Sequence, residues 1–207
     1  MFSADSSELK NRIYAYLGYH GAERSESTDS LIDESLEEVK KLSRFIYRYE
    51  YFDAPPSFLS KEPYLSYLSG STGVIVSVTT IGLDIDRRIK LLSKTDAARS
   101  VVLDSCASAY LEERADEFER ALPYSLAPRF CPGYGGSDVS DIRYIFDLLR
   151  PEKFGVTLGA NNYMLPSKSM AGIVAVNGAA NMQCKGCILE KDCRRKKEGK
   201  KCFSEKR

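Results

Sequence analysis

Apolar residues recur at helical spacing in two segments near the N-terminus. Residues 6–17 are weakly amphipathic, and residues 31–49 show a stronger pattern that Asp29 is placed to cap. The apolar positions of this second segment are Leu31, Leu36, Val39, Leu42, Ile46 and Tyr47. We therefore expect two helices joined by a polar loop over residues 21–29.

The pattern changes to that of β-strands further along the chain. Residues 49–53 are short, aromatic and followed by two prolines, which is typical of an edge strand. Residues 73–82 are rich in β-branched side chains and framed by glycines, which predicts a central strand. Residues 155–158 and 172–177 suit two further short strands.

Three more segments have helical patterns: residues 84–92, 96–122 and 138–149, the last with Ser137 as its expected cap. At about 100° per residue, six apolar side chains of the longest segment fall on one face, and we expect that face to pack on the sheet. These side chains are Leu103, Ala107, Tyr110, Leu111, Phe118 and Ala121.

Helices separate the strands in uneven blocks, without the regular alternation of a doubly wound fold. This order predicts an α+β fold with an antiparallel or mixed sheet flanked by helices. Residues 1–182 form the expected core module. Residues 183–207 are a basic, cysteine-rich tail with almost no apolar side chains, so an ordered tail would need a crosslink.

The composition fits an ordinary globular protein, with 43% hydrophobic and 29% charged residues among 207. The 30 basic side chains nearly balance the 29 acidic ones, so no overall field favours nucleic acid or an anionic membrane. The start lacks a basic segment followed by an apolar one, and the most apolar run, residues 73–83, is too short to cross a bilayer. We expect a cytoplasmic protein with neither kind of partner.

The loop over residues 129–136 carries the candidate ligand chemistry. Its key residues are Arg129, Pro132, Gly133, Tyr134, Gly135 and Gly136. The glycines permit positive φ and close backbone approach, and the proline stiffens the entry. A permanent cation and an aromatic ring with a polar tip suit a ligand with a carboxylate and a purine. The alternative interpretation is a well-packed structural turn.

Two motifs in order resemble the activation domain of cobalamin-dependent methionine synthase. The first is Arg-x-x-Pro-Gly-Tyr at 129–134, and the second is Met-Leu-Pro at 164–166, followed by a turn of small residues over 167–172. The similarity extends over about residues 73–176. It implies a chain that binds S-adenosylmethionine and supports reductive methylation of cob(II)alamin.

The resemblance also implies the roles of individual residues. Arg129 would face the methionine carboxylate of the ligand, and the backbone of Pro132, Gly133, Tyr134 and Gly135 would line the adenosine. In the family, a glutamate of the long helix meets the ligand's ammonium group. Glu113 occupies the corresponding position here, and its helical angle places it on the flank of the apolar face, whereas Glu112 points to solvent. A solvated charge is the alternative for Glu113. No catalytic side chain is implied.

The partners follow from the same resemblance. The chain has no room for the homocysteine, folate and cobalamin domains, so cobalamin would arrive on a separate methyltransferase subunit, most directly methionine synthase. The electron would come from a flavodoxin or a ferredoxin. Alternatives are an activator of another corrinoid methyltransferase that uses a cluster in the tail, a non-catalytic module that binds S-adenosylmethionine or a corrinoid, and a zinc-dependent interaction protein.

Four of the six cysteines lie in the tail, at Cys184, Cys187, Cys193 and Cys202. Four thiolates suit either a zinc ion or an iron–sulfur cluster, and free thiols are the alternative in a reducing compartment. We expect Cys106 to lie in the core and Cys131 to fill space in the loop. The single histidine, His20, is expected to be an ordinary surface residue.

Overall fold

The structure, a computed structural model, describes residues 6–19 and 24–178. Its helices are α1 (Ser6–Tyr16), α2 (Glu26–Leu42), α3 (Tyr64–Tyr67), α4 (Leu83–Thr95), α5 (Ala97–Arg120) and α6 (Ile142–Leu149). Its strands are β1 (Ile46–Phe52), β2 (Gly73–Thr80), β3 (Thr157–Leu158), β4 (Met164–Leu165) and β5 (Ser169–Val176). Short 3-10 turns occur at Ser57–Leu59, Val139–Asp141, Pro151–Phe154 and Ala160–Asn162.

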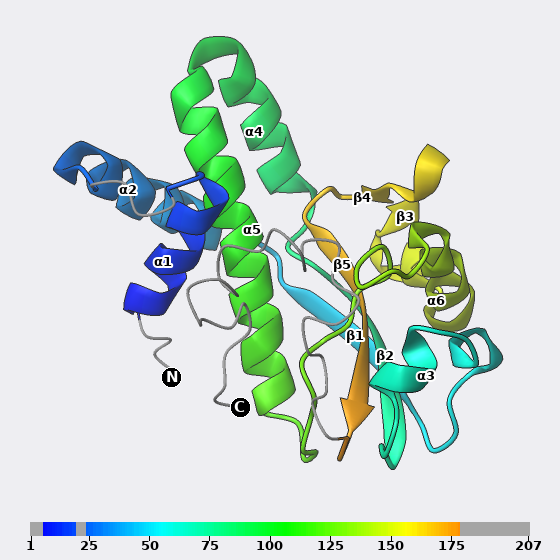
Figure 1. The fold of residues 1–207 in the computed structure, drawn as a ribbon. Helices are drawn as coiled ribbons and strands as arrows, with labels where there is room; N and C mark the ends of the chain where they lie inside the picture. Colours follow the sequence, from blue (N-terminus) through cyan, green and yellow to red (C-terminus); the bar gives the residue numbers. More distant parts are fainter. Residues whose placement is uncertain (1–5, 20–23, 179–207) are drawn as a thin grey trace.

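A three-stranded antiparallel sheet with the order β1-β2-β5 lies at the centre of the described chain. In Figure 1 it separates α3 and α6 on one side from α5, α1, α2 and α4 on the other. Strand β2 is buried along its whole length because both faces of the sheet are covered. The predicted α+β class and the central position of this strand are confirmed.

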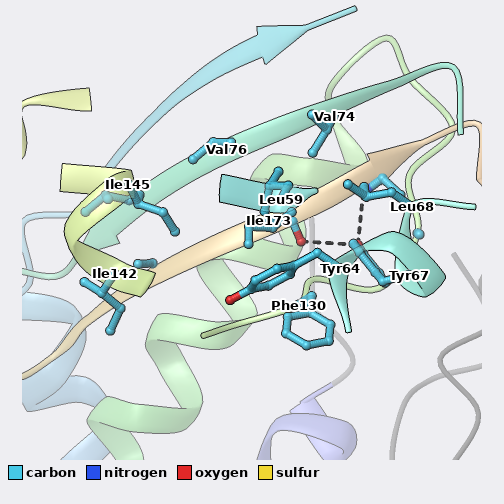
Figure 2. Packing of buried hydrophobic residues seen from close by; sticks show 14 of the residues in the cluster. Leu59, Tyr64, Tyr67, Leu68, Val74, Val76, Phe130, Ile142, Ile145 and Ile173 are labelled. Carbon is cyan, nitrogen blue, oxygen red and sulfur yellow. Dashed lines mark hydrogen bonds between the residues drawn. The ribbon is translucent and has the colours of Figure 1, made fainter. Parts of the chain in front are cut away.

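One face of the sheet packs against α3, α6 and the segment around Phe130, which precedes Gly133. Ile173 of β5, Tyr67 of α3 and Phe130 meet there (Figure 2). Phe130 and Ile173 exchange two backbone hydrogen bonds, each of 2.8 Å, and the Tyr67 hydroxyl accepts a bond of 2.9 Å from the Ala175 amide. The segment around Phe130 is thereby fixed along the outer edge of β5. Since side chains alternate along an extended chain, Arg129 points to the opposite face.

On that opposite face, α5 makes two kinds of contact. Its N-terminal half packs against α2 and α4, where Leu103 and Ala107 are fully buried beside Ile32. Its C-terminal half reaches the sheet, where Phe118 stacks on Tyr47 with ring centroids 4.4 Å apart. The expectation that the whole apolar face packs on the sheet was wrong. A helix of 24 residues is about 36 Å long, longer than the roughly 26 Å of an eight-residue strand, so part of it packs on other helices.

Two local predictions also differ from the structure. The helix expected over residues 31–49 ends at Leu42, and Ile46 and Tyr47 instead pair with Thr80 and Thr79 as part of β1. The expected cap Ser137 does not cap α6, because its hydroxyl accepts a bond from the Gly133 amide. The tail from residue 183 lies outside the described residues. Among the helices that are described, none is long and apolar enough to cross a membrane.

Ile173→Ala tests the importance of the contact between Phe130 and β5. We expect it to lower the free energy of unfolding by about 2–5 kcal/mol, because it opens a cavity in a fully buried site. Val101→Ala on α5 is the matched control: this side chain is 59% exposed, and its loss should change stability by less than about 0.5 kcal/mol. Urea unfolding followed by circular dichroism measures both. Equal effects would contradict the assigned core.

Candidate functional site

Arg129 is buried between α5 and the sheet, with 7% of its side chain exposed. Its Nε donates to Glu119 Oε1 at 2.6 Å and its Nη2 donates to Asp116 Oδ1 at 2.8 Å. Its Nη1 lies 3.2 Å from the sulfur of Met170. The aliphatic stem crosses Gly172, where a Cβ atom would approach Arg129 Cδ to 2.6 Å. A glycine in β5 is therefore needed to admit this side chain.

Glu119 links the guanidinium to the sheet. Its side chain is 1% exposed, and its Oε1 also accepts a bond of 2.9 Å from the Tyr47 hydroxyl of β1. Burial raises the pKa of Tyr47, and the nearby Glu119 carboxylate raises it further, so the phenol stays a donor. Sequence reasoning missed Glu119 and Asp116. Their signal is the three-residue spacing that places Glu113, Asp116 and Glu119 along one side of a helix.

Glu113 lies on the inner side of α5, as expected. Its side chain is 11% exposed, against 36% for Glu112, so Glu113 is the more buried of the two, as its helical angle predicts, and its role toward a ligand stays a prediction. Arg120 Nη2 lies 3.4 Å from one of its carboxylate oxygens and Arg12 Nη2 lies 3.9 Å from the other. Burial raises the pKa of Glu113, and the two arginines lower it only in part. This carboxylate is incompletely compensated.

Ion pairs join seven side chains into one group, which we call the α5 ion cluster. Its members are Arg12, Arg120, Arg129, Glu112, Glu113, Asp116 and Glu119. Three guanidinium groups face four carboxylates, so the cluster as described carries a formal charge of −1 when all are ionised. This net charge favours a positively charged group beside the cluster.

The glycine loop takes the backbone shape that its sequence predicts. Gly133, Gly135 and Gly136 have φ values of 92°, 58° and 86°, which ordinary side chains disfavour. The amide of Gly133 donates to Ser137 Oγ at 3.0 Å, so this backbone donor is already used by the loop itself. The result is a closed turn that holds Tyr134 outward, with 71% of the residue exposed.

Tyr134 stands at the rim of the α5 ion cluster. It lies near Tyr16 of α1. The pKa of Tyr16 is raised first by burial, then by Glu112 and to a smaller extent by Tyr134. The Tyr16 hydroxyl donates to Glu112. Tyr16 is therefore bonded to the partly exposed side of the α5 ion cluster, and Tyr134 lies close to Tyr16. Pro132 is buried at the base of the loop. A Cβ atom at position 135 would lie only 3.1 Å from the Phe130 ring, so the loop packs closely there.

The described cysteines have no metal site around them. Cys106 is buried in the helical core, as expected, and burial raises the pKa of the half-buried Cys131 thiol to about 11. Within residues 6–19 and 24–178, no group of three or more His, Cys, Asp or Glu side chains could hold a metal ion. The proposed ligands Cys184, Cys187, Cys193 and Cys202, together with His20, lie outside the described residues. Their roles stay predictions.

Glu119→Ala tests the buried ion pair. We expect it to lower the free energy of unfolding by about 3–5 kcal/mol, because it leaves a buried guanidinium with an incomplete set of acceptors. Glu37→Ala is the control, since it removes an exposed helical pair with Lys40 and should cost no more than about 0.5 kcal/mol. Chemical denaturation gives both values. A Glu119 variant as stable as the Glu37 variant would show that this pair does not hold the structure.

Comparisons with known proteins give a fold but no sequence relative. No family model matches the chain, and no curated protein sequence matches it. A solved structure described as "Crystal Structure of the MetH Reactivation Domain bound to AdoHcy" is similar, with a TM-score of 0.60 and 13% identity over 88% of this chain and 72% of that one. At this identity the similarity shows that the chain has the fold of that reactivation domain.

Proposed function

We propose that this chain binds S-adenosylmethionine at the α5 ion cluster and the glycine loop, and that it serves to reactivate a corrinoid methyltransferase. The observation that carries the proposal is the buried Glu113, incompletely compensated within a cluster of net charge −1 beside the loop that bears Tyr134. The fold shared with a reactivation domain whose structure holds AdoHcy supports it.

The charges of the ligand match those of the cluster. S-adenosylmethionine carries a carboxylate, an ammonium and a sulfonium, so its net charge is +1 near neutral pH. Its ammonium group would compensate the Glu113 carboxylate, which burial removes from water. Arg129 and the side chains around it would surround the amino-acid end. Tyr134 and the backbone of Pro132, Gly133 and Gly135 would lie against the nucleoside, where an aromatic ring adds stacking.

The reaction asks little of the side chains of this chain. One electron and one methyl cation from the sulfonium convert cob(II)alamin to methylcobalamin and leave S-adenosylhomocysteine. The cobalamin would be carried by a separate methyltransferase subunit, and the electron would come from a flavodoxin or ferredoxin. The role of this protein would be to hold the methyl group in line and to exclude water, which needs neither a nucleophile nor a general base.

Calorimetric titration with S-adenosylmethionine tests the site. Tyr134→Ala and Glu113→Gln should each weaken binding at least about tenfold, because one loses a stacking surface and the other a charged acceptor. Tyr163→Ala and Glu152→Gln are matched controls on exposed residues of other elements, and they should bind as the wild type does. Absence of binding in the wild type, or equal losses in the controls, would refute the proposal.

The pH dependence of the same titration adds a second readout. Because the pKa of Glu113 is raised, its carboxylate takes up a proton at a higher pH than an ordinary glutamate does. Affinity should therefore fall on acidification and begin to fall above the usual titration range, and Glu113→Gln should flatten this profile. Transfer of a radiolabelled methyl group to reduced cobalamin on a methionine synthase fragment then separates a reactivating protein from one that only binds the ligand.

A further inference from the structure

Arg12 and Arg129, the two arginines paired with Asp116, differ in how many close hydrogen bonds their guanidinium groups donate. Arg129 has short bonds of 2.6 and 2.8 Å to carboxylates and a third contact to a sulfur atom. Arg12 of α1 approaches its three carboxylate partners only to 3.4, 3.9 and 3.4 Å. Its Nη1 atom is buried and lies 3.4 Å from Glu112 Oε2, but it forms no hydrogen bond within the described part of the chain. An unused buried donor is costly unless something else satisfies it.

Access to the two guanidinium groups also differs. The side chain of Arg129 is 7% exposed and lies against the sheet, whereas that of Arg12 is 24% exposed at the junction of α1 and α5. Tyr16 follows Arg12 by one helical turn on α1 and lies near Tyr134. A ligand beside Tyr134 would therefore lie nearer to the long ion pairs of Arg12 than to the short, buried ones of Arg129.

We infer that Arg12, rather than Arg129, binds the carboxylate of the amino-acid ligand. The inference rests on the proposed function and assigns to α1 a binding residue that the loop motifs do not contain. Arg129 is committed to the fold through Glu119 and Asp116.

The position of Glu113 supports this assignment. Its Oε2 lies 3.9 Å from Arg12 Nη2. The carboxylate and ammonium of an α-amino acid are attached to the same carbon, so they need a cation and an anion side by side. Arg12 and Glu113 offer that pair, and their weak mutual contact leaves both able to exchange partners. A guanidinium also fits a carboxylate through two parallel hydrogen bonds.

The alternative is a purely structural role, in which Arg12 only neutralises neighbouring carboxylates. Partly exposed ion pairs with distances of this length contribute about 0–1 kcal/mol to the free energy of unfolding. Stability measurements would therefore not separate the two roles. A ligand that lacks only the carboxylate does separate them. Decarboxylated S-adenosylmethionine keeps the nucleoside, the sulfonium and the ammonium group.

The experiment is a calorimetric titration of the full chain with both ligands. The wild type should bind S-adenosylmethionine at least about tenfold more tightly than the decarboxylated form, as expected for charged hydrogen bonds to a carboxylate. Arg12→Ala should weaken binding of S-adenosylmethionine at least about tenfold and should abolish or reverse the preference. Arg12→Lys, which keeps the charge and loses the fork, should fall between. Arg87→Ala on α4, 71% exposed, is the matched control and should keep the wild-type preference.

The other possible results contradict either this inference or the proposed function. If Arg12→Ala keeps the wild-type preference, or loses both ligands equally while its thermal unfolding is normal, this inference is overturned and the proposed function stands. If the wild type binds neither ligand, the proposed function itself is refuted. Should Arg12→Ala unfold, the Arg12→Lys variant decides, and an unchanged preference in it would overturn the inference.

Discussion

Burial of the Arg129 guanidinium is the constraint on which the candidate site depends. Removing such a charge from water costs several kcal/mol unless close acceptors compensate it. Glu119 and Asp116 provide those acceptors from α5, Tyr47 completes the coordination of Glu119 from β1, and Gly172 leaves space for the stem in β5. Four separate parts of the chain thus meet at one cation. The loop that begins at Arg129 is held in place by this contact on one face of the sheet and by Phe130 on the other.

This division of roles gives the site two kinds of charge. The inner ion pairs are short, buried and belong to the fold. The outer ones, around Arg12 and Glu113, are long and incompletely compensated. The buried ion pairs of Arg129 hold α5 and the loop in a fixed position. A ligand can therefore bind the outer charges without the free-energy cost of rearranging the core. A molecule that carries both signs of charge on one end and an aromatic base on the other suits such an arrangement, with the base beside Tyr134.

Sequence reasoning found the elements whose signals are local. The β-branched run of β2, the helical pattern of α5 and the three loop glycines were all recognised, and each depends on neighbours in sequence. It failed where distant contacts decide. Ile46 and Tyr47 continue the helical spacing of α2, yet pairing with β2 draws them into a strand. The partners of Arg129 lie on another element, where their three-residue spacing indicates a common side of the helix but not the cation they bind. Arg12 comes from a helix without any motif.

A crystal structure of the chain with S-adenosylmethionine tests the central claim most directly. The account predicts ligand density between α1, α5 and the loop over residues 129–136, with the ammonium group at Glu113, the base beside Tyr134, and Arg129 still bonded to Glu119. Density at another face of the molecule, or a ligand that separates Arg129 from Glu119, would contradict it.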